Sequence, residues 1–288
     1  MLPSPGSPRA SFGSRLDTAR ERKGNLCVGI DPHPGLLAAW KLPDTAAGLE
    51  RFSFTVLEAV AGLCCAVKPQ VALYERHGSQ GIAVLERLLQ RAAELEVLTI
   101  ADAKRGDIGS TMTAYAEAWL ADGSALAADA LTLNPYLGFE SLRPALDCAA
   151  AHGRGVFVLA LTSNPEGASV QHAGGERSVA RSIAESAAAE NAAQEGPGSV
   201  GLVIGATVGS AVARLQLDLA ALNGPILAPG VGAQGAGMQE LRGTFGNAIA
   251  SVLPTSSRAI LAHGPDPAAL AEAAALARNN LNWASAAD

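Results

Sequence analysis

Short apolar runs alternate with longer stretches rich in Ala and Leu along most of this chain. The short runs are rich in β-branched residues, which is typical of buried strands, whereas the longer stretches carry apolar residues at helical spacing, as at Leu85, Leu88 and Leu89. This alternation predicts parallel strands joined by crossover helices. About eight runs qualify as strands, at 26–30, 64–68, 97–101, 130–133, 156–161, 201–205, 226–228 and 248–253. Eight parallel strands close a barrel, so the predicted fold class is α/β, a single-domain (β/α)8 TIM barrel.

The domain organisation follows from where this alternation begins and where it is interrupted. Residues 1–13 are rich in Pro, Ser and Gly and predict a disordered N-terminal tail, so the barrel domain is expected over 14–288. No shift in composition marks a second domain. The segment 171–198 is polar, Ala-rich and punctuated by glycines, and we interpret it as an insertion after the fifth strand.

Charged residues follow the third predicted strand directly. Asp102, Lys104 and Asp107 place two carboxylates around one ammonium within six positions. Residues two apart in a strand share a face, so Asp102 and Lys104 are expected to project together. Lys68 ends the second predicted strand in the same manner. The carboxyl ends of parallel strands meet at one rim of a barrel, where such enzymes carry their chemistry, and these residues therefore predict an active site.

Polar residues also follow the other predicted strands, among them Asp31, Asn134 and Ser163. The last two strand ends carry a glycine-rich segment that includes Gly232, and then Arg258. Glycines expose backbone N–H groups at close range and arginine adds a fork-shaped cation, a combination suited to phosphate. The predicted substrate is a small phosphate ester.

Composition and charge exclude several other classes of function. The net charge is −6 and only twelve residues are aromatic, so no groove for nucleic acid is expected. No apolar segment is long enough to cross a bilayer, and the N-terminus lacks the apolar stretch of a signal peptide. Four cysteines without a CxxC pair favour reduced thiols and a cytoplasmic location, and the five histidines lack metal-ligand spacing, so no metal site is expected.

Seven segments spread over nearly the whole chain resemble orotidine 5′-phosphate decarboxylases. In chain order they read CVGIDPHP, AVKPQVALYE, DAKRGDIGST, LNPYLG, LTSNP, APGVGAQG and SSR. The SNP segment and the length of the chain are similar to the longer bacterial (type 2) subgroup. The resemblance implies a cofactor-free loss of carbon dioxide from orotidine 5′-phosphate to give uridine 5′-monophosphate, the last step of de novo pyrimidine nucleotide synthesis.

The resemblance also implies roles for the charged residues. Lys104 would stabilise the carbanion that forms at C6 and then protonate it, because fixed charges in a dry site stabilise such a species without a cofactor. Asp102 and Asp107 would keep this lysine charged and aimed. Lys68 would join the network and contact the ribose.

The remaining site residues are implied by the same resemblance. Substrate contacts are expected from residues on several loops, namely Asp31 at a ribose hydroxyl, Ser163 at the pyrimidine edge, Gln234 and Arg258 at the phosphate, and Asn134 and Gly232 in the same site. In the family Asp107, Ile108 and Thr111 reach into the neighbouring subunit's site, which implies a homodimer. The chain departs from the family pattern at Leu161, where an arginine is expected, and at Glu166, which is inserted after Pro165.

Other interpretations of the same residues remain open. Asp102 and Lys104 could form a structural ion pair, and Asp31 could begin a turn or cap a helix. A magnesium-dependent sugar-phosphate lyase on the same barrel would need an acidic ligand near the end of the second strand, where this chain has Lys68, a cation. A non-catalytic barrel that binds a nucleotide is the third alternative. Such a barrel would not need to keep all of the charged residues, which are Lys68, Asp102, Lys104 and Asp107.

Overall fold

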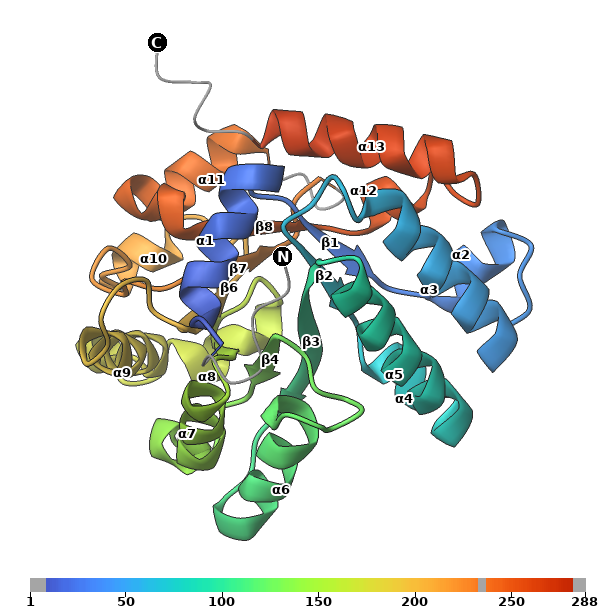
Figure 1. The fold of residues 1–288 in the computed structure, drawn as a ribbon. Helices are drawn as coiled ribbons and strands as arrows, with labels where there is room; N and C mark the ends of the chain where they lie inside the picture. Colours follow the sequence, from blue (N-terminus) through green and yellow to red (C-terminus); the bar gives the residue numbers. More distant parts are fainter. Residues whose placement is uncertain (1–8, 233–236, 282–288) are drawn as a thin grey trace.

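The computed structural model describes residues 9–232 and 237–281 of the chain. In these ranges eight parallel strands pair in chain order, and β8 pairs with β1, so the sheet closes into a barrel (Figure 1). The predicted (β/α)8 fold class is therefore confirmed. The strands are β1 (Cys27–Ile30), β2 (Ala66–Pro69), β3 (Leu98–Arg105), β4 (Ala130–Leu133), β5 (Gly155–Leu161), β6 (Val200–Ile204), β7 (Ile226–Pro229) and β8 (Val252–Ser256).

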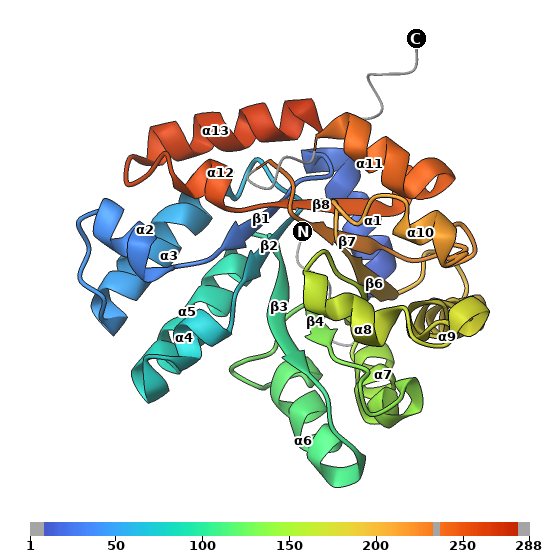
Figure 2. The same cartoon turned by 180° about the vertical axis from the view of Figure 1, so that it is seen from behind.

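Helices surround the barrel, and most of them lie between consecutive strands, as Figures 1 and 2 show from opposite ends. The α-helices are α1 (Phe12–Lys23), α2 (Pro34–Ala39), α3 (Ala46–Val60), α4 (Ala72–Glu75), α5 (Gly78–Glu94), α6 (Gly109–Leu120), α7 (Arg143–Ala151), α8 (Ala168–Gln171), α9 (Val179–Ala192), α10 (Ala211–Arg214), α11 (Met238–Phe245), α12 (Arg258–Leu261) and α13 (Pro267–Asn280). Within the described residues, short 3-10 helices join them, namely η1 (Phe139–Leu142), η2 (Pro165–Gly167), η3 (Gly175–Arg177) and η4 (Gly246–Ser251).

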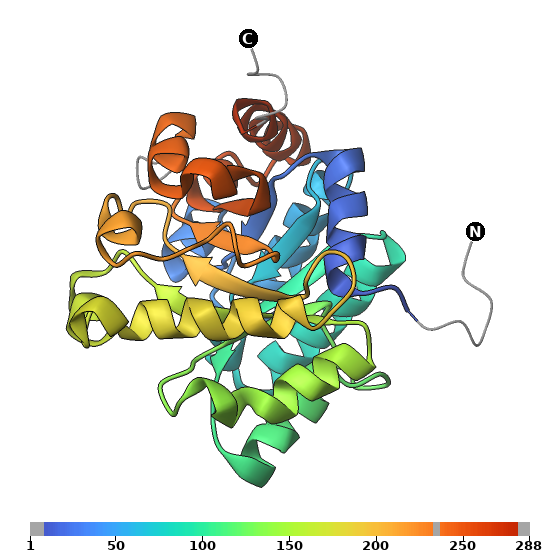
Figure 3. The ribbon, with the colours of Figure 1, turned by 90° about the vertical axis from the view of Figure 1, so that its left-hand side faces the viewer.

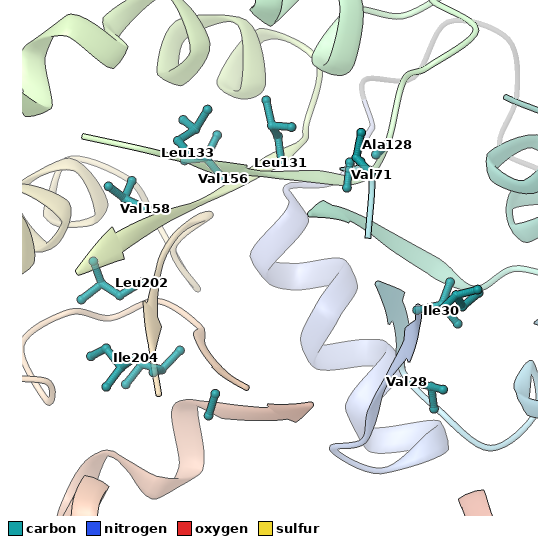
Figure 4. Close-up of a cluster of buried hydrophobic side chains, with 14 of the residues drawn as sticks. Val28, Ile30, Val71, Ala128, Leu131, Leu133, Val156, Val158, Leu202 and Ile204 are labelled. Atoms are coloured by element: carbon teal, nitrogen blue, oxygen red, sulfur yellow. The ribbon is translucent and has the colours of Figure 1, made fainter. Parts of the chain in front are cut away.

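The apolar core has two layers, because alternate residues of a strand face opposite sides of the sheet. Residues such as Val28, Leu131 and Val156 pack outward against the helices, and Figure 4 shows part of this layer. Ile100 and Phe157 belong to a separate, smaller cluster inside the barrel. The strands are buried on both faces, which explains why they read as continuous apolar runs.

The first helix closes the N-terminal end of the barrel (Figure 3). Phe12 and Leu16 of α1 are buried in the inner cluster, and the ring of Phe12 meets that of Phe157 edge-on with centroids 5.9 Å apart. Arg15, on the same helix, forms an ion pair with Asp129 at 2.5 Å. The helix thus begins within the segment predicted as a tail, and residues 9–13 belong to the folded barrel. Residues 1–8 of that segment lie outside the described residues.

Two other predicted boundaries differ from the structure. The last strand was expected at 248–253, but 246–251 forms η4 and the strand follows at Val252–Ser256. An apolar run such as Ala248-Ile249-Ala250 fits a strand and a buried helical turn equally well. The segment 171–198 contains α9, which packs against β5 and β6 as an ordinary crossover helix. The added structure lies before α9, in η2, α8 and η3.

Candidate active site

A layer of polar side chains lies directly above the inner apolar layer of the barrel. Lys68, Asp102 and Thr132 each follow a residue of the inner cluster by two positions in their strands. Thr255 stands in the same relation to Leu253 in β8. Because residues two apart share a face, the strands direct all four side chains into the barrel mouth. The site is therefore built into the sheet, on rigid elements.

The third strand extends further than predicted and is irregular where it carries the charges. It runs to Arg105, so Asp102 and Lys104 lie within β3 and not beyond its end. The pairing with β4 shifts between Ala101 and Arg105, and Lys104 adopts the left-handed backbone conformation with φ of 50°. A non-glycine residue in this conformation is strained and often marks a functional site.

Asp102 is the centre of a charge network that joins two lysines. Lys68 Nζ donates to its Oδ2 at 2.7 Å, and Lys104 Nζ donates to its Oδ1 at 2.5 Å. Thr132 Oγ1 donates to Oδ1 at 3.1 Å, and the amide nitrogen of Gln70, when turned toward the carboxylate, lies 2.7 Å from Oδ2. The side chains of Lys68 and Asp102 are 7% and 10% exposed, whereas that of Lys104 is 41% exposed. Lys104 is thus the more exposed of the two lysines.

The network keeps its buried members charged. Burial alone would raise the pKa of Asp102, but the nearby charges of Lys68 and Lys104 outweigh it and hold this pKa well below its usual value. Burial would likewise lower the pKa of Lys68, but Asp102 and Asp31 raise it above the usual lysine value. The carboxylate and the buried ammonium are therefore both ionised across the neutral pH range.

A cavity of about 580 Å³ opens beside this network at the carboxyl ends of β1, β2, β7 and β8. Asp31, Lys68 and Arg258 line it. Among the described residues, no partner hydrogen-bonds Asp31 Oδ1 or Ser257 Oγ, although both atoms are buried. Buried polar atoms are normally paired, so these two point to a ligand that supplies the missing hydrogen bonds.

In the described part of the glycine-rich segment after β7, Gly230 and Val231 line the same cavity. Gly230 and Gly232 have φ of 105° and 79°, a conformation that favours glycine. A Cβ at Gly232 would lie 3.2 Å from that of Ala259, which limits this position further. Arg258 is exposed at the start of α12. Gln234, the other residue predicted to bind phosphate, lies outside the described residues.

Several predicted site residues lie apart from the lysines within one chain. In the ranges described, no hydrogen bond joins Asp107 to Lys104 or Asp102, and Asp107 Oδ1 accepts from the backbone N–H of Ile108 at 2.8 Å. Ile108 is 62% exposed, and Thr111 is exposed on the first turn of α6. Asn134 Oδ1 accepts from the backbone N–H of Tyr136 at 3.1 Å. Within one chain these residues do not complete the charge network.

The end of β5 and the segment that follows it carry the two departures from the family pattern, Leu161 and Glu166. Leu161 is fully buried, and Ser163 next to the strand end is exposed. Gln171 reaches back from α8 and accepts from the backbone N–H of Thr162 at 2.8 Å. Glu166 accepts from the side chain of Asn164 at 3.0 Å. The inserted glutamate thus helps to shape the segment that carries Ser163.

Two residues that contact Asp102 were missed by sequence reasoning. Thr132 is the one polar position in the apolar run of β4, and Gln70 follows Lys68 by two positions. A polar residue at an inward position, two after a core residue, is the signal that could have found Thr132.

The described residues form neither a metal-binding cluster nor a membrane-spanning helix. Across 9–232 and 237–281, no group of three or more His, Cys, Asp or Glu side chains is placed to hold a metal ion. In the same part of the chain, no helix is long and apolar enough to cross a membrane.

Known proteins resemble this chain along most of its length. The family model described as "Orotidine 5′-phosphate decarboxylase / HUMPS family" matches residues 24–274. The orotidine 5′-phosphate decarboxylase of Salinispora arenicola is 55% identical over 92% of this chain and 94% of its own length, and that of Streptomyces coelicolor is 55% identical over 91% and 94%. A crystal structure from Streptomyces avermitilis is 52% identical, covers 100% of both chains and superposes with a TM-score of 0.94. The chain therefore belongs to the orotidine 5′-phosphate decarboxylase family.

Proposed function

We propose that this chain decarboxylates orotidine 5′-phosphate to uridine 5′-monophosphate, the final step of pyrimidine nucleotide synthesis, and that Lys104 is the residue that protonates C6. The observation that carries the proposal is the buried Asp102 carboxylate held between Lys68 and Lys104 at 2.7 and 2.5 Å beside an open cavity. It fits the activity named for relatives that share 55% of their residues with this chain.

Lys104 does the chemical work in this proposal. When carbon dioxide leaves, the electron pair stays in an sp² orbital at C6 that the ring cannot delocalise. The Lys104 ammonium stabilises this pair and then transfers a proton to it, so that the lysine becomes neutral and C6 carries the new C–H bond. A fixed cation that needs no reorganisation during the reaction is an effective catalyst of such a step.

Asp102 supports Lys104 in two ways. Its carboxylate keeps the ammonium aimed through the 2.5 Å contact. It also lies close to where the substrate carboxylate must sit, and the repulsion between the two is relieved as carbon dioxide leaves.

The phosphate and ribose would anchor the substrate on the other side of the cavity. Asp31 Oδ1 and Ser257 Oγ are buried atoms available to hydroxyl groups, and Arg258 offers a cation for the phosphate. Binding energy from these remote groups orients the reacting carbon next to Lys104. Ser163 would read the pyrimidine edge, with Asn134, Gly232 and Gln234 as further contacts.

We also propose that the enzyme is a cytoplasmic homodimer with shared active sites. Three large apolar side chains are exposed on the loops after β3 and β4, namely Ile108 (62%), Tyr136 (75%) and Leu137 (54%). Ile108 adjoins Asp107, and across the described part of the chain no hydrogen bond or ion pair joins Asp107 to Lys104 of its own chain. A partner could bury these apolar side chains and receive Asp107 in its site. Buried free thiols at Cys27, Cys64 and Cys65 suit a reducing compartment.

Hybrid dimers test the shared site. Asp107→Ala and Lys104→Ala subunits should each be inactive alone. If Asp107 serves the partner's site, a mixed dimer holds one site in which both residues are intact, and activity returns on mixing. Mass spectrometry verifies that the subunits have exchanged. If activity does not return in the exchanged sample, the shared site is contradicted.

The activity itself is tested by following the ultraviolet absorbance of orotidine 5′-phosphate with purified enzyme in excess EDTA. Decay with the wild type and none with Lys104→Ala supports the proposal. Decay that requires added Mg²⁺ would favour a metal-dependent lyase, and no decay would favour a barrel that only binds its ligand. The position of Lys68 at the end of β2, 2.7 Å from Asp102, already disfavours a divalent cation there.

A further inference from the structure

The irregularity in β3 leaves one backbone group in need of a partner. Between the paired positions Ala101 with Leu131 and Arg105 with Leu133, β3 advances four residues while β4 advances two. Lys104 lies in this bulge with its positive φ, and its backbone N–H does not bond to a carbonyl of β4. Bulges of this kind re-aim a side chain, but their unpaired N–H groups must be satisfied in a buried setting.

The Thr132 hydroxyl supplies that partner. Thr132 stands on β4 between the two paired positions, directly opposite the bulge, and is 1% exposed. Its Oγ1 accepts the backbone N–H of Lys104 at 2.9 Å. The same oxygen lies 3.1 Å from Asp102 Oδ1 and 3.4 Å from the carbonyl of Ala101. A hydroxyl has one proton, and the nearer, charged carboxylate is the stronger acceptor.

We propose that Thr132 is a positioning residue, whose hydroxyl holds the left-handed Lys104 backbone and the Asp102 carboxylate in one geometry and thereby sets the rate of the chemical step. One bond from this oxygen holds the Lys104 backbone and the other holds the Asp102 carboxylate. The two residues that form the contact between Nζ and Oδ1 are thus both held by Thr132. Without the hydroxyl, the Lys104 N–H is unpaired and the left-handed backbone loses the bond that stabilises it. The effect on rate rests on the proposed function.

The opposite end of β3 offers a matched control. Thr99 Oγ1 donates to Asp129 Oδ2 at 3.1 Å and accepts the backbone N–H of Asp129 at 3.0 Å. Thr99 is 4% exposed and lies near the closed end of the barrel, away from the cavity. Both threonines thus join a carboxylate to a backbone N–H, but only Thr132 does so at the lysines. Replacement by valine removes the hydroxyl and keeps the shape in both cases.

The experiment compares Thr132→Val, Thr132→Ser and Thr99→Val for kcat and KM with orotidine 5′-phosphate, for affinity for uridine 5′-monophosphate and for resistance to urea. For Thr132→Val we expect kcat to fall on the order of 10²-fold with KM and product affinity nearly unchanged, because a small misplacement of a reacting group has that effect. Thr132→Ser should recover most of kcat. Thr99→Val should lose stability and keep kcat.

Three outcomes would overturn the proposal. They are a kcat for Thr132→Val within about twofold of the wild type, a Thr132→Ser variant as slow as Thr132→Val, or an equal loss of kcat in Thr99→Val. Thr132→Ala is measured in parallel, so that a packing defect of the valine variant is recognised.

A crystal structure of Thr132→Val separates this inference from the proposed function. If the wild type does not decarboxylate orotidine 5′-phosphate, the proposed function fails, but the structure still decides the role of Thr132. Departure of Lys104 from positive φ, or loss of its contact with Asp102, supports the positioning role. A Lys104 that keeps its φ and this contact without the hydroxyl overturns it.

Discussion

The two ends of the barrel differ in how their charged side chains are paired. At the closed end, Asp129 binds Arg15 at 2.5 Å and two groups of Thr99, so its bonds come from within the chain. At the open end, Asp102 is equally well bound, but Lys104 is 41% exposed and Asp31 Oδ1 has no partner among the described residues. The Asp129 carboxylate is fully paired without a ligand, whereas the open end, as far as it is described, leaves the buried Asp31 Oδ1 without a partner beside the cavity. A carboxylate at a barrel strand is therefore no sign of function until the groups around it are examined.

The largest expected effect is on the lysine at the open end. Lys104→Ala should lower kcat on the order of 10⁴-fold or more, because it removes both the proton donor and the cation that stabilises the carbanion. Product binding should remain measurable by calorimetry, since the phosphate and ribose contacts lie elsewhere. Lys41→Ala is the control, because Lys41 is also a left-handed, exposed lysine, whereas the partner of Asp102 is Lys104. A Lys104→Ala enzyme with near wild-type rate would remove Lys104 from the mechanism.

Exchange of one carboxylate at each end tests the comparison directly. Asp102→Asn should abolish turnover and lower the free energy of unfolding by roughly 3 kcal/mol, because it leaves the buried Lys68 charge without its main partner. Asp129→Asn should destabilise the fold and leave kcat unchanged. Equal losses of kcat in both variants would mean that the two ends do not differ in function.

The pH dependence of stability should distinguish the same two variants. In the wild type the depressed pKa of Asp102 stabilises the fold above the unfolded value of about 3.9, and this is lost as pH falls through the folded pKa. The raised pKa of Lys68 stabilises the fold below about 10.4, and this is lost as pH rises through the folded pKa. In Asp102→Asn, burial lowers the pKa of Lys68, so stability should recover as pH rises toward 10. Asp129→Asn should show no such recovery, because it removes no partner of the buried Lys68. Urea titrations at a series of pH values measure the free energy of unfolding of both variants.

A substitution at the closed end should lower the stability of the fold without changing the catalytic rate. Phe12→Ala should cost about 3–5 kcal/mol of unfolding free energy, because the side chain is fully buried in the inner cluster. The rate per folded molecule should stay the same. Leu276→Ala, at a 62% exposed position, should change the stability by less than about 0.5 kcal/mol. A lower kcat in fully folded Phe12→Ala would show that the closed end also shapes the site.

The smallest expected effect concerns the phosphate. Arg258→Ala should weaken the affinity for uridine 5′-monophosphate by about 10- to 100-fold, the range for hydrogen bonds to charged groups. Arg22→Ala, an exposed arginine on α1, should leave this affinity unchanged. An unaltered affinity in Arg258→Ala would exclude Arg258 from the phosphate site.

Sequence periodicity was sufficient to predict the barrel and the rim because both depend on local pattern. The run at 130–133 coincides with β4. The charged side chains of Lys68 and Asp102 contact one another, as their positions at neighbouring strand ends predict. The bulge at Lys104 could not be predicted, because it depends on a hydroxyl 28 positions away. In the proposed dimer, the role of Asp107 depends on a second chain, which no pattern within one chain reports. The last strand was misplaced because an apolar run does not distinguish a strand from a buried turn.

The contacts of α1 bear on how the protein is made. Phe12 and Leu16 leave the ribosome early, but Gly13 bonds to Ser199, 186 residues later in the chain. At roughly 5–20 residues per second, that interval lasts on the order of ten seconds or more. During this time the inner cluster that receives the first helix is incomplete, because Val203, Leu227 and Leu253 follow later in the chain. Nascent chains therefore carry two apolar side chains that a chaperone can bind. The barrel can be closed at this end only when more than two thirds of the chain has been synthesised.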